Sequence, residues 1–264
     1  SDIWTANLGL RYDYYNDAES SFAPKFSILY SCDDEQSYKL MYQRSFRAPS
    51  WIELYGNTLQ FQGNESLKSE TIDTYQLAYS YQTAFNSWFN INIFYSNMKH
   101  FIYRNASYQL LNGKDKNSYG TELEAKFPVT EKGTLQANYS YVCAQDSDKE
   151  TIPFIANHLA NLMFYYQIDR QWHTGSKLRY VGMREREQLD TREALHGYTT
   201  FDQTLTFTKK EFSIQLSAKN IFDADVVFPS ELGDNNITAG SGTYENDFHR
   251  DGRSFWISLE WRLK

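Results

Sequence analysis

Apolar and polar residues alternate along most of the chain. The segment RSFWISLEWRLK at residues 253–264 carries an apolar side chain at every second position from Phe255 to Leu263, with mostly polar residues between them. A β-strand turns successive side chains to opposite faces, so this segment would have one apolar and one mostly polar face. The same alternation recurs in eleven further segments, at residues 4–14, 26–30, 38–43, 74–81, 89–96, 119–127, 135–141, 162–168, 177–180, 201–207 and 212–219. About twelve strands in an all-β, antiparallel fold are therefore predicted.

Two architectures are built from such strands: a soluble sandwich with its apolar face on a core, and a transmembrane β-barrel with its apolar face on lipid. The connections between the segments distinguish them, because short and long ones alternate along the chain. The short ones are 32–37, 83–87, 130–133, 169–171 and 208–211, and the long ones are 48–69, 101–118, 144–158, 182–197 and 223–252. Transmembrane barrels have short periplasmic turns and longer extracellular loops. The pattern predicts one antiparallel transmembrane β-barrel domain over residues 1–264.

Composition agrees with a membrane β-structure and narrows the function classes. Aromatic residues make up 17% of the chain, which favours strands and interfacial belts. Mean hydropathy is −0.65, and no apolar run approaches the roughly 20 residues of a membrane helix. The net charge of −7 argues against a nucleic-acid partner. The first ten residues show no secretion-signal pattern, so we expect the signal to have been removed or the segment to begin within a longer protein.

Individual side chains fit the two environments of a barrel wall. Trp4, Trp88, Trp172 and Trp261 fall at the short-turn end, where a belt of interfacial rings is expected. The face turned away from lipid is predicted to carry Arg11, Asp13, Lys25, Lys39, Asp73, Glu122, Glu124, Lys126, Lys177, Arg179, Asp202, Lys219, Glu260 and Arg262. A wide lumen, filled with water or a polar plug, accommodates that many charges, whereas a dry interior does not.

The cysteines predict neither a metal site nor a disulfide. Cys32 and Cys143 have no metal-ligand spacing. The topology places one in a short turn and the other near the opposite end of a strand. A strand of about ten residues rises roughly 3.3 Å per residue, so the two sulfurs would lie well beyond bridging distance.

Several motifs occur in an order that resembles a known family. Phe46, Arg47, Ala48 and Pro49 form an FRAP box before a long connection, and GNESLKSET follows at residues 63–71. Further along come NSYGTELEAKF at 117–127, GYTTFDQTLTF at 197–207, NIFD with Asn220, Phe222 and Asp223, and GRSFW at 252–256. Together they resemble the C-terminal part of the barrel of TonB-dependent receptors, active transporters of the Gram-negative outer membrane. The chain departs from the family where Glu65 and Ser69 replace proline, and where Leu263 and Lys264 follow the terminal aromatic residue.

The resemblance implies the second half of a barrel of roughly 22 strands. The plug domain, the TonB-binding segment and the earlier strands would then lie outside this chain, and the first strand would not pair with the last. The implied function is uptake of a scarce ligand, such as a ferric siderophore, another metal chelate or a cobalamin-like molecule, energised through the TonB complex. The implied partners are outer-membrane lipid, the plug and the remaining strands, and no cofactor is implied.

Two alternatives remain open at this point. One is a passive twelve-strand channel, complete in itself, for small anionic solutes. The other is an outer-membrane enzyme on the same barrel. For a phospholipase, His173 is followed by Thr174 rather than by a paired serine. For a protease, Asp146, Asp148 and Glu150 offer carboxylates, although a solvated acidic loop accounts for them better. No catalytic residue is therefore assigned.

Within the resemblance, substrate binds where the outer loops meet the plug. The candidate ligand contacts are Trp51, Tyr55, Arg184, Arg186, Tyr244, His249 and Arg250. Cationic side chains in these loops would suit an anionic ferric siderophore. A haem ligand is disfavoured because no histidine lies between Phe46 and Leu67, although His249 could serve from another loop.

Overall fold

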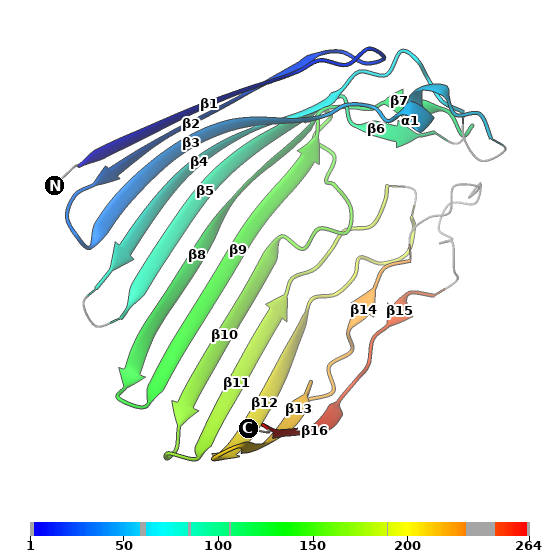
Figure 1. The fold of residues 1–264 in the computed structure, drawn as a ribbon. Coiled ribbons are helices and arrows are strands. Elements are labelled where there is room, and N and C mark those ends of the chain that lie inside the picture. The colour runs from blue at the N-terminus through cyan, green and yellow to red at the C-terminus, as the bar shows by residue number, and fades with distance from the viewer. Residues whose placement is uncertain are drawn as a thin grey trace.

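The computed structural model describes residues 3–58, 62–83, 86–105, 107–188, 190–230 and 246–262. Twelve strands form one antiparallel, curved sheet in which neighbours follow one another along the chain (Figure 1). The strands are β1 (Trp4–Asp13), β2 (Ser21–Ser31), β3 (Gln36–Arg47), β4 (Glu70–Gln82), β5 (Trp88–Lys99), β8 (Lys116–Thr130), β9 (Gly133–Asp146), β10 (His158–Gln167), β11 (Trp172–Val181), β12 (Tyr198–Lys209), β13 (Phe212–Lys219) and β16 (Ser254–Trp261). The predicted number of strands and their antiparallel order are confirmed.

Short turns and long connections lie at opposite ends of this sheet, here called the turn end and the loop end (Figure 1). The long connections carry elements that the sequence pattern did not predict: α1 (Trp51–Tyr55) and the hairpins β6 (Ile102–Arg104) with β7 (Leu110–Asn112) and β14 (Val227–Phe228) with β15 (Phe248–His249). Among the described residues, no helix is long and apolar enough to cross a membrane. The structure therefore confirms the predicted separation of long and short connections.

The strand register lines up the apolar positions across the whole sheet. Leu40 lies opposite Ile28 on one side and Leu77 on the other, and Leu259 lies opposite Ile214 at the far edge. These side chains have little protein to cover them: Leu259 is 67% exposed and Leu40 is 52% exposed. A continuous apolar face without protein cover is the surface expected to contact lipid.

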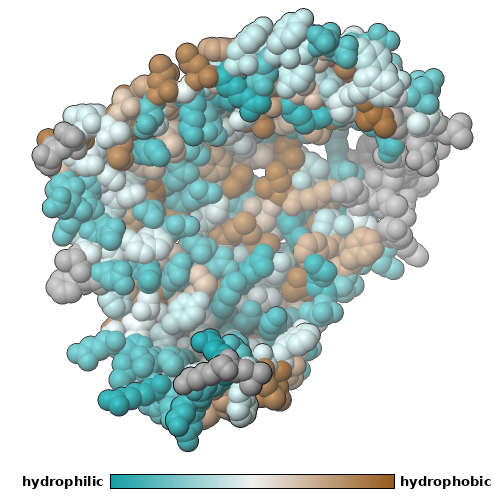
Figure 2. Space-filling model, viewed as in Figure 1, coloured by the Kyte–Doolittle hydropathy of each residue, from teal (hydrophilic) through white to brown (hydrophobic). Residues whose placement is uncertain are grey.

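The other face of the sheet is mostly polar. Figure 2, in the same view as Figure 1, shows a hollow around which hydrophilic and intermediate side chains predominate. The register places Lys177 opposite Asp202 on this face, and Asn92 opposite Glu122. Because successive residues alternate between the faces, these pairs share a side that the apolar row does not use.

One predicted assignment to the polar face is wrong. Asp73 lies two residues from Tyr75, so it projects from the apolar face, directly opposite Arg44. The Arg44 guanidinium donates to the Asp73 carboxylate at 2.7 and 2.8 Å, and the Tyr42 hydroxyl donates to it at 2.8 Å. Asp73 is tolerated there because it is near the loop end of the strand and its charge has a full set of partners.

The tryptophan belt also needs one correction. Trp4, Trp172 and Trp261 lie on the apolar face at the turn end, each against an aromatic neighbour in the next strand, with ring centroids between 4.4 and 6.0 Å apart. Trp88 is at the same end, but it lies opposite Gln82 and Lys126 on the polar face. Three of the four predicted rings therefore form the lipid-facing belt.

The sheet is open. β1 and β16 are its two edges, and they do not pair with each other among the described residues (Figure 1). Unpaired backbone groups cost several kcal/mol each in lipid, so both edges require neighbouring strands in a membrane. This arrangement matches a portion of a larger barrel, and it does not support the closed twelve-strand channel. The two cysteines are free, Cys32 after β2 at the turn end and Cys143 within β9.

Candidate functional site

The connections 48–69 and 100–115 pack together at the loop end and form what is here called the first loop cluster. Leu54, Leu67 and Ile102 are each at least 93% buried, and Leu110 packs against them. This small apolar core lies outside the sheet and holds α1 against the β6–β7 hairpin. The long loops at this end are thus folded structures rather than isolated tethers.

The FRAP box anchors this cluster to the sheet. Arg47 ends β3, and its guanidinium contacts the carboxylates of Glu70 at 2.6 Å and Glu53 at 2.8 Å. Glu70 also accepts a hydrogen bond from the backbone nitrogen of Ile102 at 2.7 Å. Ser50 and Glu53 form a reciprocal capping box that starts α1 immediately after Pro49. One arginine therefore ties a strand end, a helix and a hairpin together.

The electrostatic environment of Glu53 reflects this anchoring. Burial acts to raise the pKa of Glu53, but hydrogen bonds from Arg47 and Ser50 outweigh it, and the pKa is lowered. The carboxylate is thereby kept ionised and available to both partners.

The GNESLKSET segment joins the two connections of the first loop cluster through side-chain amides. Asn112 accepts from the backbone nitrogen of Lys68 at 2.8 Å and donates to the Lys68 carbonyl at 3.0 Å. The Asn64 amide donates to the Leu110 carbonyl at 2.9 Å. These bonds connect β7 to a segment that is not a strand, and they fix the β6–β7 hairpin in place.

The connections 182–197 and 220–253 form a second loop cluster, held by paired charges in its described part. The Arg186 guanidinium, whose side chain is 7% exposed, donates to the Asp247 carboxylate, with one contact at 3.0 Å. Arg192 donates to Asp190 at 2.6 Å and to the Ser230 hydroxyl at 2.7 Å. Hydrogen bonding from Arg186 lowers the pKa of Asp247 to about 2. The charges compensate one another within the cluster.

Arg184 has a different partner in the same cluster. It is 8% exposed, and its guanidinium donates to the backbone carbonyl of Val227 at 2.8 Å. Its carbon Cζ also lies 5.9 Å from the centre of the Tyr198 ring. The predicted basic pair, Arg184 and Arg186, therefore connects the two segments of the second loop cluster.

The NIFD and GRSFW motifs close the base of connection 220–253. Asn220 and Asp223 both have positive φ, and the Asn220 amide exchanges hydrogen bonds with the backbone of Ala224 at 2.8 and 2.9 Å. Asp223 accepts from the Arg253 backbone nitrogen at 2.7 Å. A Cβ atom on Gly252 would lie only 2.5 Å from Asp223 Oδ1, so any larger residue would require the Asp223 side chain to shift. The exposed Phe222 ring stacks on Phe201 at 5.7 Å.

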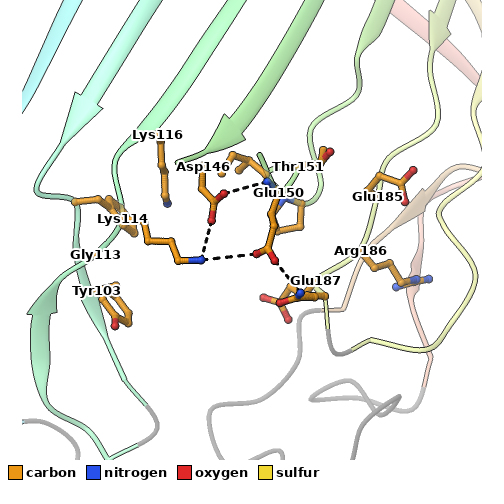
Figure 3. Close-up of a pocket in the computed structure, with 14 residues that line it drawn as sticks. Tyr103, Gly113, Lys114, Lys116, Asp146, Glu150, Thr151, Glu185, Arg186 and Glu187 are labelled. Atoms are coloured by element: carbon orange, nitrogen blue, oxygen red, sulfur yellow. Dashed lines mark hydrogen bonds and ion pairs between the residues drawn. The ribbon is translucent and has the colours of Figure 1, made fainter. Parts of the chain in front are cut away.

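A cavity of about 690 Å³ lies between the two loop clusters and the β9–β10 connection (Figure 3). Its walls are Phe101, Tyr103, Gly113, Lys114, Lys116, Asp146, Glu150, Thr151, Ile152, Pro153, Glu185, Arg186, Glu187 and Gln188. Pockets that bind small molecules typically measure roughly 300–1,000 Å³ and combine apolar walls with a few polar groups. This cavity is the candidate ligand site.

Lys114 forms the polar centre of one wall. Its ammonium nitrogen contacts Asp148 at 2.5 Å, Asp146 at 3.3 Å and Glu150 at 3.9 Å, and these partners raise the pKa of Lys114. Glu150 also accepts from the Gln188 amide at 2.8 Å, which joins the wall to the second loop cluster (Figure 3). The arrangement is a junction of three connections around one cation.

The predicted contact residues lie in three places. Arg186 lines the cavity. Trp51, 70% exposed, lines a separate hollow of about 370 Å³ beside connection 14–20, and Tyr55 packs against Trp51 with ring centroids 5.7 Å apart. His249 Nδ1 lies 2.7 Å from Asp225, and the Arg250 guanidinium lies 4.7 Å from the Phe228 ring centre. Tyr244 lies outside the described residues.

The structure does not bring these candidates into one site, and their ligand roles stay predictions. Most cavity residues were not singled out from the sequence as ligand contacts. The sequence could show only that Phe101, Tyr103 and Lys114 belong to a long connection, because no motif includes them. Asp146 and Glu150 had been considered as protease carboxylates, and they are instead partners of Lys114.

Comparisons with known proteins agree with this architecture. The family model described as "TonB dependent receptor-like, beta-barrel" matches residues 1–221. An iron-regulated outer membrane virulence protein of Vibrio cholerae is 22% identical over 285 residues, covering 96% of this chain and 41% of that protein. A crystal structure of a mutant of the ferric enterobactin receptor of Pseudomonas aeruginosa, in complex with enterobactin, has a TM-score of 0.83 at 17% identity, covering 99% of this chain and 43% of that one. The ferripyoverdine receptor of the same organism, bound to ferripyoverdine, has a TM-score of 0.76 at 17% identity, with 99% and 36% covered.

These matches define both the family and the extent of the chain. The chain spans about two-fifths of the length of the relatives it matches. The structural likenesses show the fold, and the family model covers well over half of the residues. The chain belongs to the family of TonB-dependent receptor-like β-barrels.

Proposed function

We propose that this outer-membrane protein takes up a scarce metal chelate, with a ferric siderophore as the leading candidate. The observation that carries the proposal is the cavity of about 690 Å³, built where the folded connections meet at the loop end of the sheet. A pocket in that place meets solutes from outside the cell before they reach the lumen. Another metal chelate or a cobalamin-like ligand would use the same position.

The loop clusters suit capture followed by release. Each is internally braced, the first through Arg47 and the second through Arg186 and Asp247. The wall between them depends on the partly exposed contacts of Lys114 and Glu150. Solvent screens exposed ion pairs, so this junction is the part of the site that opens most readily. We propose that release inward is energised by the TonB complex acting through a plug domain.

The test is iron uptake by cells that make or lack this protein. Radiolabelled iron would be supplied as ferric chelates of several classes to iron-limited cells deleted for their other receptors. We expect saturable uptake of at least one chelate only in cells that make the protein, and loss of that uptake when a protonophore dissipates the proton motive force. Uptake that persists with the protonophore would refute energised transport and favour passive diffusion. No difference between the two strains for any chelate would refute the proposal altogether.

A further inference from the structure

The connections at the loop end carry most of the negative charge of the protein. In their described residues there are fifteen Asp or Glu and only nine Lys or Arg. In sequence, residues 231–245 add three acidic residues and no basic ones. These connections therefore have a net charge of −9, from eighteen acidic and nine basic residues. The whole chain has a net charge of −7, so the rest of the chain is net positive. The connections of this chain therefore contribute a negative potential at the loop end.

The basic side chains at the cavity are all engaged within the protein. Lys114 contacts the carboxylates of Asp146 and Asp148. Arg186 is paired with Asp247, and the Lys116 ammonium lies 3.4 Å from the centre of the Phe101 ring. Among the described residues, each cation of the cavity wall already has a partner, which an anionic ligand would have to displace. Displacing the buried Arg186 would leave the Asp247 carboxylate without its cation, which is costly, while the exposed Lys114 is held more weakly by its carboxylates.

The wall offers complementary features to a ligand that is not anionic. Asp146, Glu150, Glu185 and Glu187 outnumber the three cations of the wall. Phe101 and Tyr103 add aromatic surface, and the contact of Lys116 with Phe101 shows that a cation is already accommodated on such a face. Ile152 and Pro153 add apolar surface that favours burial of an uncharged chelate shell.

We propose that the ligand of this site is a metal chelate whose net charge is zero or positive, and that the acidic loop end selects against anionic chelates. The inference rests on the proposed uptake function and specifies its substrate class. It reverses the expectation from the sequence that basic loop residues would bind an anionic siderophore, because those residues are used inside the protein.

The experiment compares ferric chelates that differ only in charge. A ferric trihydroxamate would carry an amide, an ammonium or a carboxylate at one distal position, giving net charges of 0, +1 and −1 on one metal core. Initial uptake would be measured at subsaturating concentration in cells that depend on this protein, at about 0.01 M and 0.15 M salt. We expect the +1 chelate to enter on the order of tenfold faster than the −1 chelate at low salt, and the ratio to shrink at high salt.

Variants test whether the loop carboxylates cause the selection. Glu150→Gln with Glu187→Gln should reduce the ratio of +1 to −1 uptake about threefold. Glu131→Gln, the same substitution in the β8–β9 turn at the opposite end, is the matched control and should leave the ratio unchanged. Surface labelling would verify equal amounts of each protein in the membrane.

The possible results distinguish a failure of the charge selection from a failure of the proposed uptake function. Uptake of the −1 chelate as fast as the +1 chelate, or a ratio unaffected by the double variant, would overturn the charge selection and leave the uptake function standing. Absence of uptake for all three chelates and for every other class tried would overturn both.

Discussion

Asp247 is expected to control the stability of the second loop cluster. It joins connection 220–253 to Arg186, whose side chain is almost fully buried, and it accepts from the Ser230 backbone nitrogen at 3.0 Å. The pKa of Asp247 falls from its ordinary 3.8 to about 2, mainly because Arg186 hydrogen-bonds the ionised carboxylate. Each tenfold change in proton affinity corresponds to roughly 1.4 kcal/mol, so the ionised form contributes about 2 kcal/mol. Asp247→Asn should lower the free energy of local unfolding of the second loop cluster by about 2 kcal/mol.

Hydrogen exchange of backbone amides measures this opening. Arg184 and Leu195 exchange a pair of backbone hydrogen bonds at 3.0 Å across connection 182–197, so their amides report its local unfolding. A loss of about 2 kcal/mol should speed their exchange about 30-fold in Asp247→Asn. Asp225→Asn is the control, because Asp225 pairs with His249 on the exposed surface, whereas Asp247 pairs with Arg186.

The pH dependence gives an independent check with a fixed sign. A carboxyl group whose pKa is lowered in the folded state stabilises the fold fully above its unfolded pKa, and that stabilisation is lost as the pH falls. For Asp247 the loss should run from about pH 4 to about pH 2 in the unsubstituted protein and be missing in Asp247→Asn. Equal exchange rates for the Arg184 and Leu195 amides in Asp247→Asn and Asp225→Asn would refute the reasoning.

Two further substitutions test the sheet. Leu259→Arg should reduce the fraction of heat-modifiable folded barrel on gels, because arginine on the lipid face is unfavourable, by up to roughly 2–4 kcal/mol at the midplane and by less toward the turn-end belt. The neighbouring Glu260→Gln on the polar face should assemble normally, and equal losses would mean that the faces are reversed. Gly120→Ala should also impair assembly, because its Cβ would lie 2.0 Å from the Tyr141 carbonyl oxygen. Gly9→Ala is the control and should be tolerated, because the nearest atom to its Cβ would be 3.7 Å away. Normal assembly of Gly120→Ala would show that β8 and β9 can separate.

The alternation of side chains determined the strands, their number and the lipid-facing surface from the sequence alone. A period of two residues is a local property of the chain, so Leu40 or Leu259 reveals its face without knowledge of any partner. The same rule explains the errors. Asp73 was assigned to a face by its charge instead of by its place in the alternation, and the register reversed that assignment. Trp88 lies at the predicted turn end, but the alternation places it on the polar face, outside the lipid-facing belt.

The tertiary structure decided what the loops do. The sequence shows Arg186 as a basic loop residue that could bind an anion, but its guanidinium is paired with Asp247, 61 residues further along the chain. Lys114 likewise meets Asp146 and Asp148 across a different connection. Such pairings depend on which loop ends the sheet brings together and carry no local periodic signal. The sequence therefore determined which end of the sheet carries the long loops, while only the folded structure determined how the charges of those loops are paired.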